Sequence, residues 1–96
     1  MNETALKTKV LNWLRKEFPE GFFWKSSDNF TAGLPDIIGC IKTRMIAIEL
    51  KVGKNNPTLQ QKYTIKKLDQ AGAITGICYN LNDIRELLLL FDMYCK

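Results

Sequence analysis

The sequence predicts an α/β domain in which a mixed four-stranded sheet is built in the order helix, three strands, helix, strand, with a C-terminal helix. Apolar residues recur at helical spacing near the start, in the middle and near the end of the chain. Short β-rich runs separate these segments, and a helix between two strands indicates a crossover and parallel pairing. The 96 residues suffice for one domain, residues 1–96, with a modest core.

The first helix is expected over residues 3–18. Asn2 is a suitable N-cap, and Pro19 ends the segment. Glu3 falls on the inward stripe of this helix, either as a first-turn acid favoured by the helix dipole or as a site residue. The apolar stripe consists of Leu6, Val10, Trp13 and Leu14.

Three strands are expected next, over residues 21–27, 36–41 and 45–52. A short polar turn joins the last two, which predicts an antiparallel hairpin. The third strand is a continuous apolar run, as in a buried central strand, yet it ends with Glu49 and Lys51. Charges are rare in such strands unless they are paired or bind a metal.

The second helix is expected from the N-cap Thr58 to about Ala71, with Gly72 as its stop. Gln61 stands three residues after Thr58, as a capping box requires. It also shares a stripe with Ile65, so its side chain either caps the helix or points toward the sheet. The residues alone favour the cap.

A fourth strand is expected over residues 73–79 and a final helix over residues 84–94. Four consecutive leucines, residues 87–90, span a full turn of that helix. This pattern favours a partner surface over a helix buried within its own domain.

Composition limits the chemistry. The net charge of +4 fits an anionic partner, and histidine is absent. Its absence excludes Ser-His-Asp and Cys-His catalysis and the usual zinc sites, which leaves carboxylates, lysine and a hard cation. Three separated cysteines, Cys40, Cys78 and Cys95, are expected to be reduced and to fill the core, in a cytoplasmic protein with no signal peptide and no membrane span.

Strand geometry predicts a metal site at the end of the hairpin. Glu49 and Lys51 share one face of the third strand, and the hairpin brings Asp36 alongside. Two close carboxylates repel one another without a cation between them, and oxygen ligands suit Mg²⁺ or Mn²⁺. The alternative is an exposed hairpin with a surface Glu-Lys pair and Asp36 as a turn cap.

These residues resemble a nuclease signature. Pro35-Asp36, positions 37–48 (twelve residues) and then Glu49-Leu50-Lys51 are similar to the PD-(D/E)xK motif. Gly33-Leu34 before it, and Thr58-x-x-Gln61 followed by Ala71-Gly72, narrow the resemblance to the VRR-NUC family, over nearly the whole chain. The resemblance implies a restriction-endonuclease-like core, similar to that of Holliday junction resolvases.

The resemblance also implies roles for single residues. Asp36 and Glu49 would hold the metal together with the backbone carbonyl of Leu50, Lys51 would assist catalysis, and Gln61 would support the site. Glu3 would complete the metal ligands, although Glu17 or Glu20 could take its place. The implied activity is Mg²⁺-dependent cleavage of branched, Holliday-junction-like or flap DNA that leaves a 5′ phosphate, in a bacterial cell or phage-infected host.

Two further sets of residues complete these expectations. The candidates for nucleic-acid contacts are Lys25, Ser26, Ser27, Lys42, Arg44, Lys54 and Lys62. The candidates for a homodimer interface are Leu59, Tyr63, Leu89 and Leu90. The alternatives to the enzyme are a non-catalytic basic nucleic-acid-binding module and a nuclease subunit that is inactive alone.

Overall fold

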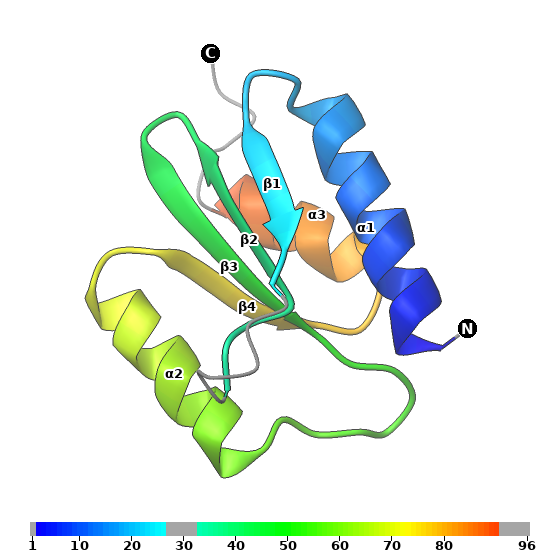
Figure 1. Ribbon diagram of the computed structural model, residues 1–96, viewed down its shortest axis with the longest axis vertical. Helices are drawn as coiled ribbons and strands as arrows, with labels where there is room; N and C mark the ends of the chain where they lie inside the picture. The colour runs from blue at the N-terminus through cyan, green and yellow to red at the C-terminus, as the bar shows by residue number, and fades with distance from the viewer. Residues whose placement is uncertain (1, 27–32, 91–96) are drawn as a thin grey trace.

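The computed structural model describes residues 2–26 and 33–90, and within them the elements follow the predicted order (Figure 1). One sheet has the strand order β1-β2-β3-β4, in which β3 is antiparallel to β2 and parallel to β4. The predicted hairpin and crossover are therefore confirmed. The elements are α1 (Glu3–Glu17), β1 (Phe22–Lys25), β2 (Ile37–Ile41), β3 (Arg44–Leu50), α2 (Leu59–Gln70), β4 (Ile74–Cys78) and α3 (Leu81–Leu90).

The hydrophobic core lies between the sheet and the helices α1 and α3. Each of these helices buries one apolar stripe against the strands, through Leu6, Val10 and Leu14 of α1 and Ile84 and Leu88 of α3. Helix α2 lies on the other side of the sheet from α1 and has no buried residue (Figure 1). The sheet face on the α2 side is consequently the more open one.

Strand β3 is buried from Ile46 to its end at Leu50. Ile46, Ile48 and Leu50 belong to the core, and the residues between them point to the opposite face. On that face Ala47 is fully buried and Glu49 is only 1% exposed. A buried carboxylate therefore lies near the end of an inner strand of the sheet.

The starts of the helices α1, α2 and α3 are set by N-capping residues. Asn2 caps α1, since its Oδ1 accepts the Ala5 N–H, and the predicted Thr58–Gln61 capping box begins α2. Helix α3 begins at Leu81 rather than at residue 84, because Asn80 accepts a hydrogen bond from the Asp83 N–H and acts as the N-cap. The predicted extension to residue 94 and Cys95 lie outside the described residues.

Two predictions about apolar residues have different outcomes. In the leucine turn of α3, Leu88 is buried and Leu87 half-buried, whereas Leu89 and Leu90 are exposed. Cys78 is buried, but the prediction that Cys40 fills the core is wrong, because Cys40 lies exposed on the α2 side of β2. No helix in residues 2–26 and 33–90 is long and apolar enough to cross a membrane.

Candidate active site

Asp36, Glu49 and Lys51 come together where β2 begins and β3 ends. Ile37 pairs with Ile48, so the next position along the two strands places Asp36 beside Glu49. The Asp36 Oδ2 accepts a hydrogen bond of 2.8 Å from the Leu50 N–H, which fixes this carboxylate against β3. The Lys51 Nζ lies 3.3 Å from the Glu49 Oε2.

The segment before Asp36 is fixed by close packing against α2. Gly33 has a φ of +83°, and a Cβ on it would lie 2.7 Å from the Gln60 carbonyl oxygen. A side chain there would therefore meet both backbone strain and a clash. Pro35 is buried, and the Asp36 carbonyl accepts a 2.9 Å hydrogen bond from the Ser26 N–H. The Gly-Leu-Pro sequence thus places Asp36 between β1, β3 and α2.

The electrostatics of the site centre on Glu49. Burial, and next the negative charge of Asp36, raise the pKa of Glu49 to about 7, against the opposing effect of Lys51. Its Oε1 is buried and has no hydrogen-bond partner among the described residues. Leaving a buried carboxylate oxygen unpaired is costly. This oxygen is therefore suited to a cation or a proton.

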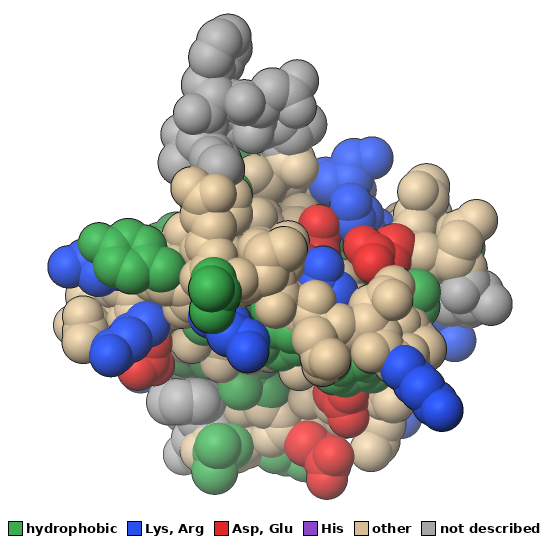
Figure 2. Space-filling view, turned by 90° about the horizontal axis from the view of Figure 1, so that it is seen from below, with side chains coloured by type: hydrophobic (Ala, Val, Ile, Leu, Met, Phe, Trp, Pro, Cys, Tyr) green, Lys and Arg blue, Asp and Glu red, His purple; other side chains and the backbone are tan. Residues whose placement is uncertain are grey.

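Lys7 also belongs to this site, although it is not among the site residues predicted from the sequence. Its Nζ lies 3.1 Å from the Asp36 Oδ1, and the two side chains are 26% and 16% exposed. The available signal was spacing, because Lys7 is one helical turn after Glu3 and lies on the same side of α1. Figure 2 shows acidic and basic side chains next to one another at this end of the molecule.

The described residues do not bring three acids together. Glu3 is half-buried in the first turn of α1, but the described residues contain no group of three or more Asp, Glu, His or Cys placed to hold a metal. Glu17 and Glu20 are exposed at the other end of α1. The metal-ligand roles of all three remain predictions, and Lys7 is the α1 residue that contacts Asp36.

Gln61 and Leu50 each use one group in a structural contact. The Gln61 Oε1 accepts a 2.8 Å hydrogen bond from the Thr58 N–H, so the cap favoured by the sequence is present. Leu50 is fully buried and contributes its N–H to Asp36. A site role for the Gln61 side chain and a metal role for the Leu50 carbonyl remain predictions.

The candidate nucleic-acid contacts divide by position. Lys25 and Ser26 adjoin Asp36 at the end of β1, and the exposed Lys54 follows β3. Lys42 and Arg44 lie at the opposite turn of the hairpin, roughly 20 Å from Asp36 at about 3.3 Å per residue, and the Arg44 guanidinium donates to the Gly72 carbonyl. The structure therefore brings the first set to the site and not the second. Lys62 is exposed on α2, and Ser27 lies outside the described residues.

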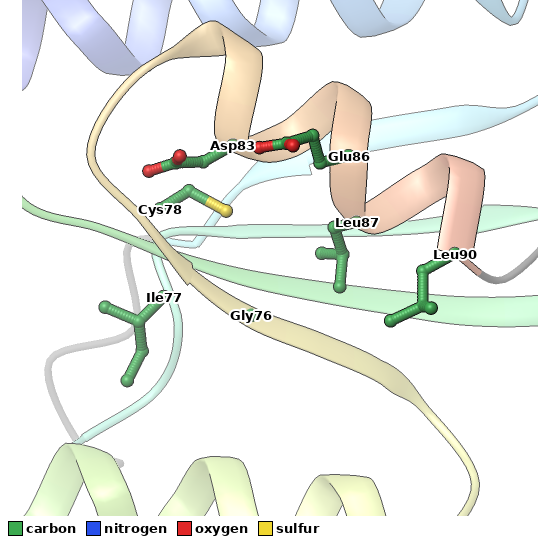
Figure 3. A pocket seen from close by; sticks show the side chains of 7 residues that line it. All are labelled: Gly76, Ile77, Cys78, Asp83, Glu86, Leu87 and Leu90. Carbon is green, nitrogen blue, oxygen red and sulfur yellow. The ribbon is translucent and has the colours of Figure 1, made fainter.

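A groove of about 440 Å³ lies away from the carboxylates, between the edge strand β4 and α3. Leu87 and Leu90 point from α3 toward β4 (Figure 3). Burial, and then the charge of Asp83, raise the pKa of the adjacent Cys78 thiol to about 12, so this cysteine is a poor nucleophile. The groove also contains the carboxylates of Asp83 and Glu86, but each accepts a hydrogen bond within this segment, Asp83 from the Tyr79 N–H and Glu86 from the Asn82 amide. The buried pair of Asp36 and Glu49, with its unpartnered oxygen, therefore remains the candidate site.

The residues at the carboxylate pair fit a magnesium ion. Mg²⁺ is typically bound by one or two carboxylates and completes its coordination with water and substrate phosphate. Asp36 and Glu49 supply two carboxylates, and the unpartnered Oε1 of Glu49 supplies a buried oxygen ready to bind a cation. The chain has no histidine, so imidazole, a common zinc ligand, is not among the donors.

A comparison with solved structures supports the fold. A chain named "VRR_NUC domain protein" matches with a TM-score of 0.74 and 21% sequence identity, over 93% of this chain and 86% of that one. The chain therefore has an α/β fold of the VRR-NUC, restriction-endonuclease-like type, and the predicted fold class is confirmed. No protein-family model matches the chain, and no curated protein matches its sequence.

Proposed function

We propose that this protein is a Mg²⁺-dependent nuclease that hydrolyses phosphodiester bonds in DNA. The observation that carries the proposal is a buried glutamate with an unpartnered oxygen, beside a second carboxylate and a lysine, on the central strand of the sheet. The name of the similar structure supports a nuclease on this fold. A purely structural Glu-Lys pair would be exposed or fully hydrogen-bonded, and Glu49 is neither.

Each residue has a distinct task in the proposed reaction. Asp36 and Glu49 would hold the ion, which when bound neutralises phosphate charge and lowers the pKa of a water molecule. The hydrogen bond from the Leu50 N–H keeps Asp36 in position. The Lys51 ammonium, at the edge of the buried pair, orients the attacking water or stabilises the negative charge that develops on the phosphate.

The substrate is proposed to be structured DNA, such as a branched, Holliday-junction-like or flap molecule. The net charge of +4 supports an anionic partner. Lys25 ends β1, Lys54 follows β3 and Lys62 is exposed on α2, and these three would contact phosphates with little reading of bases. The phosphorus-oxygen bond that breaks leaves a 5′ phosphate. Mn²⁺ would replace Mg²⁺.

Cleavage assays test the proposal directly. The purified protein is incubated with labelled four-way junction, flap, linear duplex and single strand, each with Mg²⁺ or with EDTA. Cleavage of a structured substrate only with Mg²⁺, and its loss in Asp36→Asn and Glu49→Gln, supports the proposal. Salt-sensitive binding without any cleavage, unchanged in both variants, would show a non-catalytic binding module instead.

We also propose that the protein acts as a homodimer, in a reducing cytoplasm of a bacterial cell or phage-infected host. The candidate interface residues Leu59, Tyr63, Leu89 and Leu90 are 85%, 65%, 60% and 78% exposed, respectively. Side chains of this kind on a small domain favour a protein contact. Sedimentation of Leu59→Lys and Leu90→Lys beside the wild type tests the two helices separately. A wild-type monomer at micromolar concentration would contradict the dimer.

A further inference from the structure

An exposed aromatic pair lies on the same sheet face as Glu49. Phe22 and Trp24 stand two residues apart on β1 and are 70% and 43% exposed, whereas Phe23 between them belongs to the core. The centroids of the two exposed rings are 5.6 Å apart, with 44° between the ring planes. Adjoining exposed apolar groups of this size mark a binding surface.

The strand register places this pair next to the carboxylates. Trp24 pairs with Ile38, so Asp36 is the diagonal neighbour of Trp24 on the adjacent strand. Diagonal neighbours in a sheet lie about 7–8 Å apart. A stacked nucleic-acid strand advances about 3.4 Å per nucleotide. Trp24 therefore lies about two nucleotides from Asp36. Phe22 lies two residues before Trp24 on β1, further from Asp36.

The surroundings of the pair suit a nucleic-acid strand. Lys25 and Ser26 directly follow Trp24 and lead to Asp36, whose carbonyl accepts the Ser26 N–H. The exposed Lys25 adds a positive charge next to Trp24 on β1, with its side chain starting from the opposite face of the strand. On the other side, Phe22 pairs with Cys40, which is also exposed and lengthens the apolar surface.

We propose that Phe22 and Trp24 stack on unpaired bases next to the scissile phosphate, so that the nuclease selects DNA containing a single-stranded segment over fully paired duplex. Aromatic side chains on an open sheet face bind single strands in this way, because every base offers a flat π-surface. The faces of paired bases are covered by their neighbours in a duplex and are unavailable to the rings. This inference rests on the proposed function, since it assigns the substrate of that same site.

Fluorescence tests the stacking independently of cleavage. The chain has two tryptophans, Trp13 and Trp24, so the Trp13→Phe variant contains Trp24 alone. In EDTA, where no cleavage is expected, this protein is titrated with a single-stranded oligonucleotide and with an abasic strand of equal length and charge. Quenching of Trp24 by the first and not by the second supports stacking. Equal quenching by both strands overturns it.

Binding measurements test the consequence for the substrate. Trp24→Ala is expected to bind flap DNA about tenfold more weakly, since stacking contributes that much per base, and to bind blunt duplex as the wild type does. Trp24→Phe should retain most of the affinity for the flap. Phe22→Ala should repeat the selective loss, and circular dichroism checks that each variant folds.

Different experimental results would contradict the stacking surface and the proposed nuclease activity. A wild type that cleaves with Mg²⁺, together with Trp24→Ala that binds and cleaves the flap equally well, overturns the stacking surface alone. Selective stacking by a protein that cleaves nothing supports the surface and contradicts the nuclease. If Phe22→Ala and Trp24→Ala convert a dimer to a monomer and leave single-strand binding unchanged, the surface is an interface between copies and the inference is wrong.

Discussion

The Nζ of Lys7 lies 3.1 Å from the Oδ1 of Asp36, so the first helix places a positive charge on one of the two carboxylates of the candidate site. The other oxygen of Asp36 is held by the Leu50 N–H. Asp36 is therefore satisfied on both oxygens, whereas Glu49 has one oxygen on Lys51 and one without a partner. A cation that binds both carboxylates would compete with Lys7 for Asp36.

Lys7→Met should tighten Mg²⁺ binding in the absence of DNA by a few-fold, because the variant has no ammonium group to compete for Asp36. Calorimetric titration of Mg²⁺ into the metal-free protein measures this effect. Lys9→Met, at an exposed position of the same helix, is the matched control and should bind Mg²⁺ as the wild type does. Weaker binding by Lys7→Met would contradict the competition.

Lys51→Met should lower the single-turnover cleavage rate by about 10²–10³-fold, the usual loss when one group that stabilises developing charge is removed. Methionine keeps much of the apolar stem of lysine and removes the ammonium that faces Glu49. Lys66→Met, an exposed change on α2, is the control for general loss of positive charge. A rate of Lys51→Met equal to that of Lys66→Met would show that Lys51 has no catalytic task.

The metal-free protein should lose stability as the pH rises through the titration of Glu49. Burial and Asp36 raise its pKa from 4.5 to about 7, so the folded state binds this proton more tightly than the unfolded state between those values. The contribution of this proton is fully present below 4.5 and is lost as the pH rises through about 7.

Glu49→Gln removes that titration. The free energy of unfolding of the variant, relative to the wild type, should rise by on the order of 2 kcal/mol between about pH 5 and about pH 8. Urea unfolding of both proteins in EDTA at the two pH values measures the change. A difference that is independent of pH would mean that Glu49 titrates near its ordinary range.

The two halves of the capping box separate structure from function in Gln61. Thr58→Ala and Gln61→Ala each remove one capping hydrogen bond and should each lower the free energy of unfolding by about 1 kcal/mol. If Gln61 also supports the site, only Gln61→Ala lowers the cleavage rate at a temperature where both variants are folded. Equal rates in the two variants would restrict Gln61 to the cap.

The parts of the site that the sequence predicted are those set by local geometry. Strand alternation and hairpin pairing alone place Asp36 beside Glu49 and Lys51, and the Thr-x-x-Gln spacing specifies the cap of α2. These features depend on residues close in the chain or joined by one short turn. They were therefore accessible without knowledge of the helix positions.

The features that the sequence missed depend on packing between distant elements. The contact of Lys7 with Asp36 requires the start of α1 to lie at the end of the hairpin. The hydrophobic pattern of the sequence does not predict this packing. The exposure of Cys40 depends on which face of β2 packs against the core, and the residues of β2 that belong to that core are Ile37 and Ile41. The early start of α3 depends on the side chain of Asn80, a residue type that serves equally in loops and caps.

The position of a bound metal ion tests the central claim most directly. Crystals of the protein soaked with Mn²⁺ should show an anomalous difference peak that contacts both Asp36 and Glu49, with Lys7 displaced from Asp36. The same soak of Glu49→Gln should lose or greatly weaken that peak. The soak uses Mn²⁺ at or above the concentration at which the protein cleaves DNA. The account would be contradicted by a wild-type crystal in which Lys7 remains on Asp36 and no peak lies between the two carboxylates.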